Sequence, residues 1–384
     1  MVNNDVDNEE YKYSYEDPYS YLKSEYLRLN YKKHTLMGIN LDDYFEINQN
    51  IYGNNERELF ESDKILFQQL KEMSEKLDLP IDEQDDSTFW LLNRHSNIVT
   101  KVMKENNIIL NQNIILGTLP INDLNALTCE FSENERLVAL NQGLFQFVYL
   151  MGRMISSLFL EIDNNKTKNS LNFNLKIKPI DGKIKFDKGD NEKFLEVLTL
   201  YFVYENLFKS KTYFEKDKNM ILSACLWDNA ELFVVAHEYA HISMDELSNK
   251  KDMKRRFLDD DSKLYEVIRD WNEEFKADQI ALQIILTRSD DFDSGLVGNY
   301  LGVEFLFACI DIIERINVKI NGEKLSETHP SARIRIENLR KFLKVILPKN
   351  ADNLINGSKI ISDILMELWE QNEETFYKLY KTKK

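Results

Sequence analysis

One helical segment constrains the fold more than any other part of the chain. The pattern of residues 228–244 predicts a helix, and several residues near its start make it strongly apolar: Ala230, Leu232, Phe233, Val234 and Val235. A helix of this kind is buried in the protein interior. The same segment contains His237, Glu238 and His241. We therefore expect a core helix whose polar side chains are compensated by partners.

Asp228 is expected to begin this helix. An aspartate at the first position can accept hydrogen bonds from the free backbone N–H groups of the first turn. Glu231 follows three residues later, which is the arrangement of a capping box. The sequence thus predicts a helix start at Asp228.

The spacing of the two histidines suits a metal ion. His237 and His241 are four residues apart, so their imidazoles extend from the same helical face, one turn apart. Both can reach one Zn2+ ion at about 2.0–2.1 Å. Glu238 leans toward the same side and can take a proton from water whose pKa the metal lowers toward about 7. The alternative is a pair of core histidines that are satisfied without a metal.

A catalytic zinc ion needs a third protein ligand, and residues 271–282 offer carboxylates on a predicted helix. At about 100° per residue, an apolar stripe lies within about 60° of Glu274. The members of the stripe are Val267, Trp271, Ala281 and Ile285. Asp278 lies on the same face, one turn further on. Because two buried carboxylates need compensation, we predict Glu274 as the third ligand and Asp278 as the acceptor that orients a ligand histidine.

Two alternatives stay open for this acidic helix. Glu273 competes with Glu274 for the ligand position, although it points about 100° away, toward the polar face. Glu274 and Asp278 could also form ordinary salt bridges.

The motif with its acidic helix resembles the gluzincins, specifically the CAAX prenyl protease and heat-shock membrane protease family. The matching residues are the HExxH of His237 to His241, Glu274-x-x-Ala277-Asp278, and His329-Pro330 followed by Arg335-Ile336. The resemblance implies that His329 and Arg335 sit near the active site. There they support the tetrahedral intermediate or the ligand Glu274. The alternatives are a helix-start residue for His329 and a surface salt bridge for Arg335.

Two upstream segments resemble the same family. They are Leu124-Asn125-Ala126-Leu127, similar to the family's Asn-Ala strand, and Gln142-Gly143-Leu144, similar to its Gly-Leu turn. The resemblance implies that Asn125 and Ala126 belong to an edge strand of the cleft, where an extended peptide adds as a further strand. The alternative is plain strand packing.

The resemblance covers about residues 124–144 and 230–339, and the chain departs from typical family members, which span membranes. Its most apolar long stretch, residues 137–160, is interrupted by polar residues: Asn141, Gln142, Gln146 and Arg153. We interpret this stretch as a buried helix and expect no membrane span. Soluble minigluzincins fit better, and a weaker likeness is to bacterial phage-exclusion peptidases.

Composition narrows the expected partners and compartment. The net charge of −16 repels phosphate backbones, so we expect no nucleic-acid ligand. Three widely spaced cysteines, Cys129, Cys225 and Cys309, favour buried thiols in a reducing compartment. Residues 1–10 lack the basic and apolar regions of a signal peptide. We expect a cytoplasmic protein, and its abundant Asn, Lys and Ile suggest a bacterial source.

The expected fold class is α+β and predominantly helical, because the chain has only 12 Gly and 6 Pro in 384 residues. We predict a zincin-like core with a small antiparallel sheet whose edge strand lines the cleft. Strands are expected near 108–109 and 114–116, and as a pair over 124–131 and 136–140. Helices are expected at 66–77, 142–160, 191–208, 228–244, 263–286, 303–316, 331–345 and 358–380.

Three regions are predicted along the chain. Residues 1–115 form an acidic, Tyr-rich arm and a helical region, in which the arm packs over the domain or serves as an interaction surface. Residues 116–345 form the gluzincin-like catalytic domain. It contains an inserted hairpin near 163–190, with a turn at Asp181-Gly182. Residues 346–384 form a C-terminal helix.

The sequence supports a zinc-dependent peptidase that binds one Zn2+ ion and cleaves peptide or protein substrates. In this hypothesis the metal activates water and Glu238 acts as the general base, in a regulated protease of a bacterial stress or phage-defence response. The alternative is a non-catalytic zinc-fold protein that regulates or binds a protein partner. A third hypothesis is a latent protease whose N-terminal arm covers the cleft.

Overall fold

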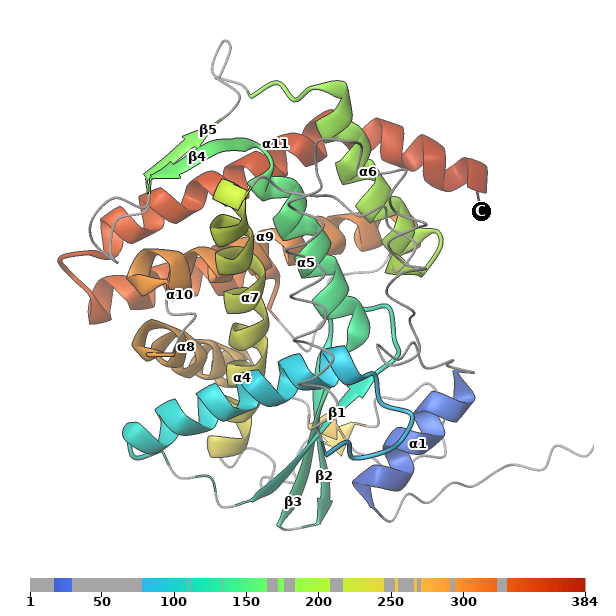
Figure 1. The fold of residues 1–384 in the computed structure, drawn as a ribbon, viewed down its shortest axis with the longest axis vertical. Helices are drawn as coiled ribbons and strands as arrows, with labels where there is room; N and C mark the ends of the chain where they lie inside the picture. Colours follow the sequence, from blue (N-terminus) through green and yellow to red (C-terminus); the bar gives the residue numbers. More distant parts are fainter. Residues whose placement is uncertain are drawn as a thin grey trace, which may run out of the picture.

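The computed structural model describes residues 17–29, 78–108, 110, 112–132, 134–163, 172–175, 184–207, 217–244, 253–254, 266–267, 271–290, 294–322 and 330–383. These residues are mostly helical, with a small three-stranded sheet near the bottom of Figure 1, beside α1. The expected fold class, α+β and predominantly helical, is confirmed. The helix expected at 66–77 and most of the Tyr-rich arm lie outside the described residues.

The helices are α1 (Pro18–Arg28), α4 (Asp86–Glu105), α5 (Gln142–Ser156), α6 (Lys188–Phe202), α7 (Asp217–Ser243), α8 (Trp271–Thr287), α9 (Gly295–Asn321), α10 (Ala332–Ile346) and α11 (Ala351–Lys383). The strands are β1 (Asn113–Leu119), β2 (Ala126–Ser132), β3 (Glu135–Asn141), β4 (Phe159–Asp163), β5 (Asn172–Leu175), β6 (Met253–Lys254) and β7 (Glu266–Val267). Helix α7 crosses the middle of the fold, packed against α4, α5, α8 and α9.

The three-stranded sheet has the order β1-β3-β2. Strands β2 and β3 pair antiparallel, as the sequence predicts. Strand β1 is parallel to β3, so the sheet is mixed and the expectation of a purely antiparallel sheet is wrong. In sequence, β2 comes between β1 and β3, but in the sheet it lies on the other side of β3 from β1. The chain runs along β2 in the opposite direction and then returns along β3 in the direction of β1. Among the described strands, β2 therefore lies at one edge of the sheet.

The two faces of the sheet pack against different partners. Alternate β3 residues Val138 and Leu140 join the main helical core. Their neighbours Leu137 and Ala139 join a smaller core with Tyr21 of α1. Thus α1 covers the face of the sheet that is turned away from α7.

Helices α7 and α9 approach each other closely at Gly302. A Cβ atom at this position would lie 2.5 Å from the Cβ of Asn229 and 2.9 Å from the carbonyl oxygen of Cys225. Contacts this short do not occur between real side chains, so the packing requires glycine here. The close contact places the backbone of α7 directly against the most apolar helix of the fold.

Among the described helices, α9 is long and apolar enough to cross a membrane. However, 78% of its most apolar window is buried inside the fold. Core helices of globular domains have the same composition, so this is weak evidence for a span. The sequence placed the most apolar stretch at 137–160 instead. The three cysteines are buried and free, as expected.

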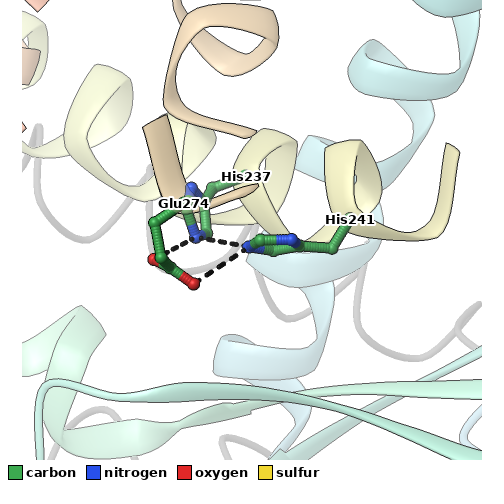
Figure 2. A group of neighbouring side chains, drawn as sticks. All are labelled: His237, His241 and Glu274. Carbon is green, nitrogen blue, oxygen red and sulfur yellow. Dashed lines mark hydrogen bonds and ion pairs between the residues drawn. The ribbon is translucent and has the colours of Figure 1, made fainter. Parts of the chain in front are cut away.

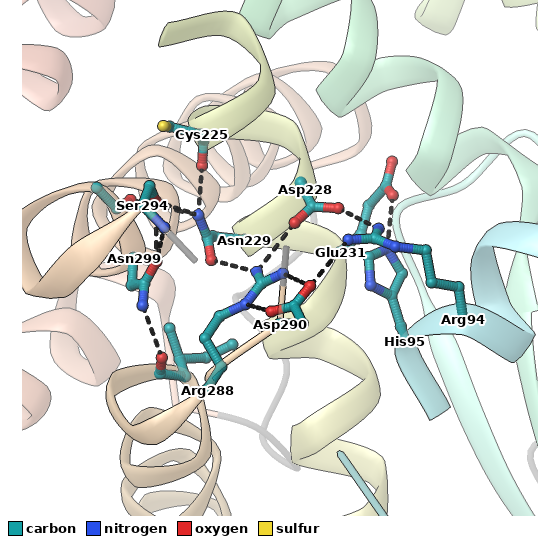
Figure 3. A network of polar contacts seen from close by, with 12 residues as sticks. Arg94, His95, Cys225, Asp228, Asn229, Glu231, Arg288, Asp290, Ser294 and Asn299 are labelled. Atoms are coloured by element: carbon teal, nitrogen blue, oxygen red, sulfur yellow. Dashed lines mark hydrogen bonds and ion pairs between the residues drawn. The ribbon is translucent and has the colours of Figure 1, made fainter. Parts of the chain in front are cut away.

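The start of α7 differs from the prediction. The helix begins at Asp217, so Asp228 lies within it and caps nothing. Its carboxylate instead binds Arg94 of α4 and Arg288, which follows α8. Figure 3 shows this network between the helices. Glu231 likewise forms a hydrogen bond with a residue of another helix: its Oε2 lies 3.0 Å from Nε2 of His95 on α4.

The hairpin expected near 163–190 pairs differently from the prediction. Strand β5 pairs antiparallel with β4, which precedes it, and residues 184–187 form no strand. The expected turn at 181–182 lies outside the described residues. The short strands β6 and β7 pair with each other, and β7 lies close to β2.

A candidate metal centre and active site

Three side chains from two helices converge on one point in the core. His237 and His241 of α7 and Glu274 of α8 each direct one ligand atom toward the others, within 4.8 Å of one another (Figure 2). His237 is 7% exposed, and the other two are fully buried. Helix α7 supplies both imidazoles because residues four apart lie on one face. Helix α8 brings the carboxylate opposite them.

The distances within this cluster suit a small tetrahedral ion. The two Nε2 atoms are 3.0 Å apart. The Glu274 oxygens lie 3.5 Å from Nε2 of His237 and 3.4 Å from Nε2 of His241. Ligands held at zinc distances and at the tetrahedral angle would be about 3.4 Å apart. Two nitrogens and a carboxylate are also the donor set of catalytic zinc sites. The residues present therefore fit one zinc ion.

Asp278 orients His237 within the cluster. It lies one turn after Glu274 on α8, and its Oδ1 is 2.9 Å from Nδ1 of His237. Nδ1–H donates to this carboxylate, which leaves the lone pair of Nε2 facing His241 and Glu274. Burial lowers the pKa of His237, but the hydrogen bonds to Asp278 and Glu274 raise it to about 9. An ion binding here must displace that proton.

Arg335 of α10 holds Asp278 from the other side. Its Nε and Nη2 lie 2.9 and 2.5 Å from the two oxygens of Asp278, and Nη1 lies 3.8 Å from Glu274. Burial raises the pKa of Asp278, but the Arg335 charge and the hydrogen bonds to Arg335 and His237 together keep the pKa below its usual value. The guanidinium also lies 5.1 Å above the ring of Phe307. Arg335 is thus near the cluster, where the resemblance places it, and it contacts Asp278 and the proposed ligand Glu274.

Glu238 contacts the sheet. Its Oε2 accepts a hydrogen bond of 2.6 Å from Oγ1 of Thr128 on β2, and both side chains are buried. The sequence analysis did not identify Thr128. The available signal was the alternation of β2, in which Thr128 faces the same side as Ala126, while Leu127 and Cys129 face α1.

The remaining predicted site residues are placed as follows. Ala126 begins β2, and Asn125 precedes it and accepts the backbone N–H of Asn141. His329 lies outside the described residues. Glu273 is not part of the three-residue cluster, so the geometry selects Glu274. In the predicted apolar stripe, Trp271 is 43% exposed, because it stands at the first residue of α8.

A second buried acid lies six residues before His237. Glu231 and His95 are both fully buried, and their bond joins α7 to α4. Burial raises the pKa of Glu231 well above its usual value, and the nearby charge of Asp228 adds to this effect. Burial likewise lowers the pKa of His95 to about 3. The pair therefore holds one proton and no net charge.

Comparison with known families bears on this part of the chain. Residues 201–353 match the family model Peptidase U49, a stretch that contains α7, α8, α9 and α10. The match supports a peptidase, and a peptidase acts on a peptide or protein. A search among curated proteins and a search among solved structures each found no match.

Proposed function

We propose that this chain is a zinc-dependent metallopeptidase of the gluzincin type, which hydrolyses peptide bonds. The observation that carries the proposal is the convergence of His237, His241 and Glu274 at ligand-to-ligand distances of 3.0 to 3.5 Å, with Glu238 adjacent in sequence. The family match supports the broader part of the proposal, that the chain is a peptidase. One Zn2+ ion held there would supply Lewis acidity, which lowers the pKa of water and polarises a carbonyl.

The chain's own residues divide the remaining work. The Glu238 carboxylate accepts a proton from the attacking water and passes it to the leaving amine nitrogen. Asp278 and Arg335 fix the tautomer and orientation of His237. Since Arg335 is bound to Asp278, the resemblance leaves His329 as the candidate donor to the developing oxyanion.

Substrate binding is proposed at the edge of the sheet. Strand β2 is an edge strand and carries Thr128 against Glu238. A peptide pairing with its backbone, next to Asn125 and Ala126, would lie along the same wall as the proposed base. This would orient the scissile bond by main-chain hydrogen bonds and would demand little of the substrate sequence.

The test pairs activity with metal content. Glu238→Gln should bind zinc as the wild type does but lose turnover, about 10^2-fold or more, because the amide accepts no proton. New peptide termini in cells expressing each form, identified by mass spectrometry, give the activity. Zinc content is measured on the purified proteins. Wild-type turnover in Glu238→Gln would remove the mechanism.

A matched pair tests the third ligand. Glu274→Gln should lower the zinc affinity strongly, whereas Glu273→Gln changes a neighbouring acid on the same helix and should leave it unchanged. Equal zinc loss in the two variants would contradict the assignment of Glu274.

The rival function is a non-catalytic zinc-fold protein that binds or regulates a partner. A structural site needs no general base, so a buried glutamate directly after His237 in the sequence favours catalysis. The wider role that we propose is a cytoplasmic protease of a bacterial stress or phage-defence response, controlled by a protein partner. It rests on the likeness to phage-exclusion peptidases, and identification of the cleaved proteins would test it.

A further inference from the structure

Thr128 connects the sheet to the helix that carries the HExxH motif. Its hydroxyl and the Oε2 of Glu238 are 2.6 Å apart, although the two residues are 110 positions apart in the chain. Thr128 is 1% exposed and Glu238 is 5% exposed. Hydrogen bonds to a carboxylate are shorter and about twice as strong as those between neutral groups. In this buried position water competes little for the bond.

The bond restricts how Glu238 can point. A glutamate side chain has three rotatable torsions, and several rotamers are open to it on a helix. Holding one carboxylate oxygen on Thr128 removes most of these rotamers and restricts where the second oxygen can lie. The anchor itself is rigid, because Thr128 is paired within the sheet with Val138 of β3.

We propose that Thr128 is a positioning residue for the general base Glu238. The inference rests on the proposed peptidase function and extends it to a residue outside the metal-binding motif. Since β2 is the edge strand expected to bind the peptide, the Thr128 hydroxyl sets the base at a defined position relative to the bound backbone. Small displacements of a catalytic group, of about 1 Å, can cost about 10^2-fold in rate.

The test compares three threonine variants of the full-length, zinc-loaded chain. Thr128→Val removes the hydroxyl with little change in volume, and Thr128→Ser keeps it. Thr118→Val is the matched control, because Thr118 is also buried in this sheet but bonds Gln84 and Tyr26, away from the cluster. Peptides from a digested bacterial proteome serve as the substrate pool, and one cleaved peptide is then synthesised for steady-state kinetics.

We expect Thr128→Val to lower kcat about 10–100-fold with KM and zinc content unchanged. Thr128→Ser should stay within about threefold of the wild type, because it can still donate. Thr118→Val should lower the melting temperature and leave kcat unchanged. Wild-type kcat in Thr128→Val, or equal losses in the valine and serine variants, would overturn the proposal.

A second readout separates this proposal from the peptidase function. Acetohydroxamate binding to the zinc-loaded protein, measured by calorimetry, probes the metal and the adjacent carboxylate without turnover. We expect Thr128→Val and Glu238→Gln to weaken it, and the double variant to weaken it no further than Glu238→Gln. Equal affinity in wild type and Thr128→Val overturns the positioning role even if no peptide is cleaved. Unchanged turnover in Glu238→Gln instead removes the peptidase mechanism itself.

Discussion

Two segments of α7 hold buried charge in different ways. Around Asp228, the carboxylates of Asp228 and Asp290 each meet both Arg94 and Arg288, so these acids and bases compensate each other (Figure 3). Nine residues further on, two imidazole nitrogens and a carboxylate face one another (Figure 2). Arg335 beside them forms its short contact with Asp278 and lies 3.8 Å from Glu274. Three lone-pair donors aimed at one point call for a cation or a proton. The comparison separates an ion-pair network that links helices, formed by Asp228, Arg94, Arg288 and Asp290, from a cluster whose geometry suits an ion.

The largest effect is expected in the ion-pair network around Asp228. Asp228→Ala would leave Arg94 and the fully buried Arg288 without this shared acid. Removing one partner of a buried ion pair costs about 3–5 kcal/mol. We expect the free energy of unfolding to fall by that amount, measured by urea denaturation of the metal-free protein. A loss below about 1 kcal/mol would show that this network does not hold the helices.

Removing the metal should come next. An ion that binds only the folded state at 100 times its Kd stabilises it by about 2.7 kcal/mol. We expect a chelator to lower the melting temperature of the wild type and zinc to restore it. Glu274→Gln provides the control, since its melting temperature should respond little to either. The comparison breaks down if Asp228→Ala loses its zinc response while Glu274→Gln keeps it.

Arg335 tests whether the metal cluster depends on its supporting residues. Arg335→Lys keeps the charge but cannot bind both oxygens of Asp278 as the guanidinium does. Loss of an outer partner of a metal ligand typically lowers metal affinity about 10–100-fold. Competition with a coloured zinc chelator measures this, and Arg340→Lys, on the same helix and bound to Glu304, is the matched control.

The smallest effect depends on pH and concerns the pair of Glu231 and His95. Burial raises the pKa of Glu231, and burial lowers the pKa of His95 to about 3, so the folded pair keeps one proton. Unfolded, an ordinary histidine loses its proton near pH 6.5. Above that pH the folded state holds one more proton, and wild-type stability falls by up to about 1.4 kcal/mol per pH unit.

Glu231→Gln removes this linkage, because the amide is neutral at every pH. We expect the variant to gain stability relative to the wild type between pH 7 and 8, by at most about 1.4 kcal/mol. Urea denaturation at the two pH values measures it. A difference that shrinks as the pH rises would contradict the shared proton.

Local patterns in the sequence predicted much of the site. His237 and His241 lie together because a single helix turn separates them, and Glu274 and Asp278 share a face of α8 for the same reason. The antiparallel pairing of β2 and β3 was predicted from two apolar stretches that are separated by a short polar turn. These features depend on residues near one another in the chain, which a periodicity can reveal.

What the sequence did not predict depends on distant partners. Asp228 has the residue type of a helix cap, but its carboxylate serves arginines that lie 134 and 60 positions away. Thr128 looked like an ordinary strand residue, because its partner Glu238 lies on another element. Likewise, the choice of β4 over residues 184–186 as the partner of β5 is a tertiary one. A single sequence carries no direct record of such pairs.

The glycine contact between α7 and α9 has a mechanical consequence. At Gly302 no side chain of α9 separates the two helices, so α7 and α9 pack too closely there for either to shift along the other. The histidines therefore lie on a helix that packs closely against α9, a long and mostly buried apolar helix. The motif helix and the paired strand β2 are therefore both fixed by packing, so substrates of different shape would have to adapt their own conformation to the site.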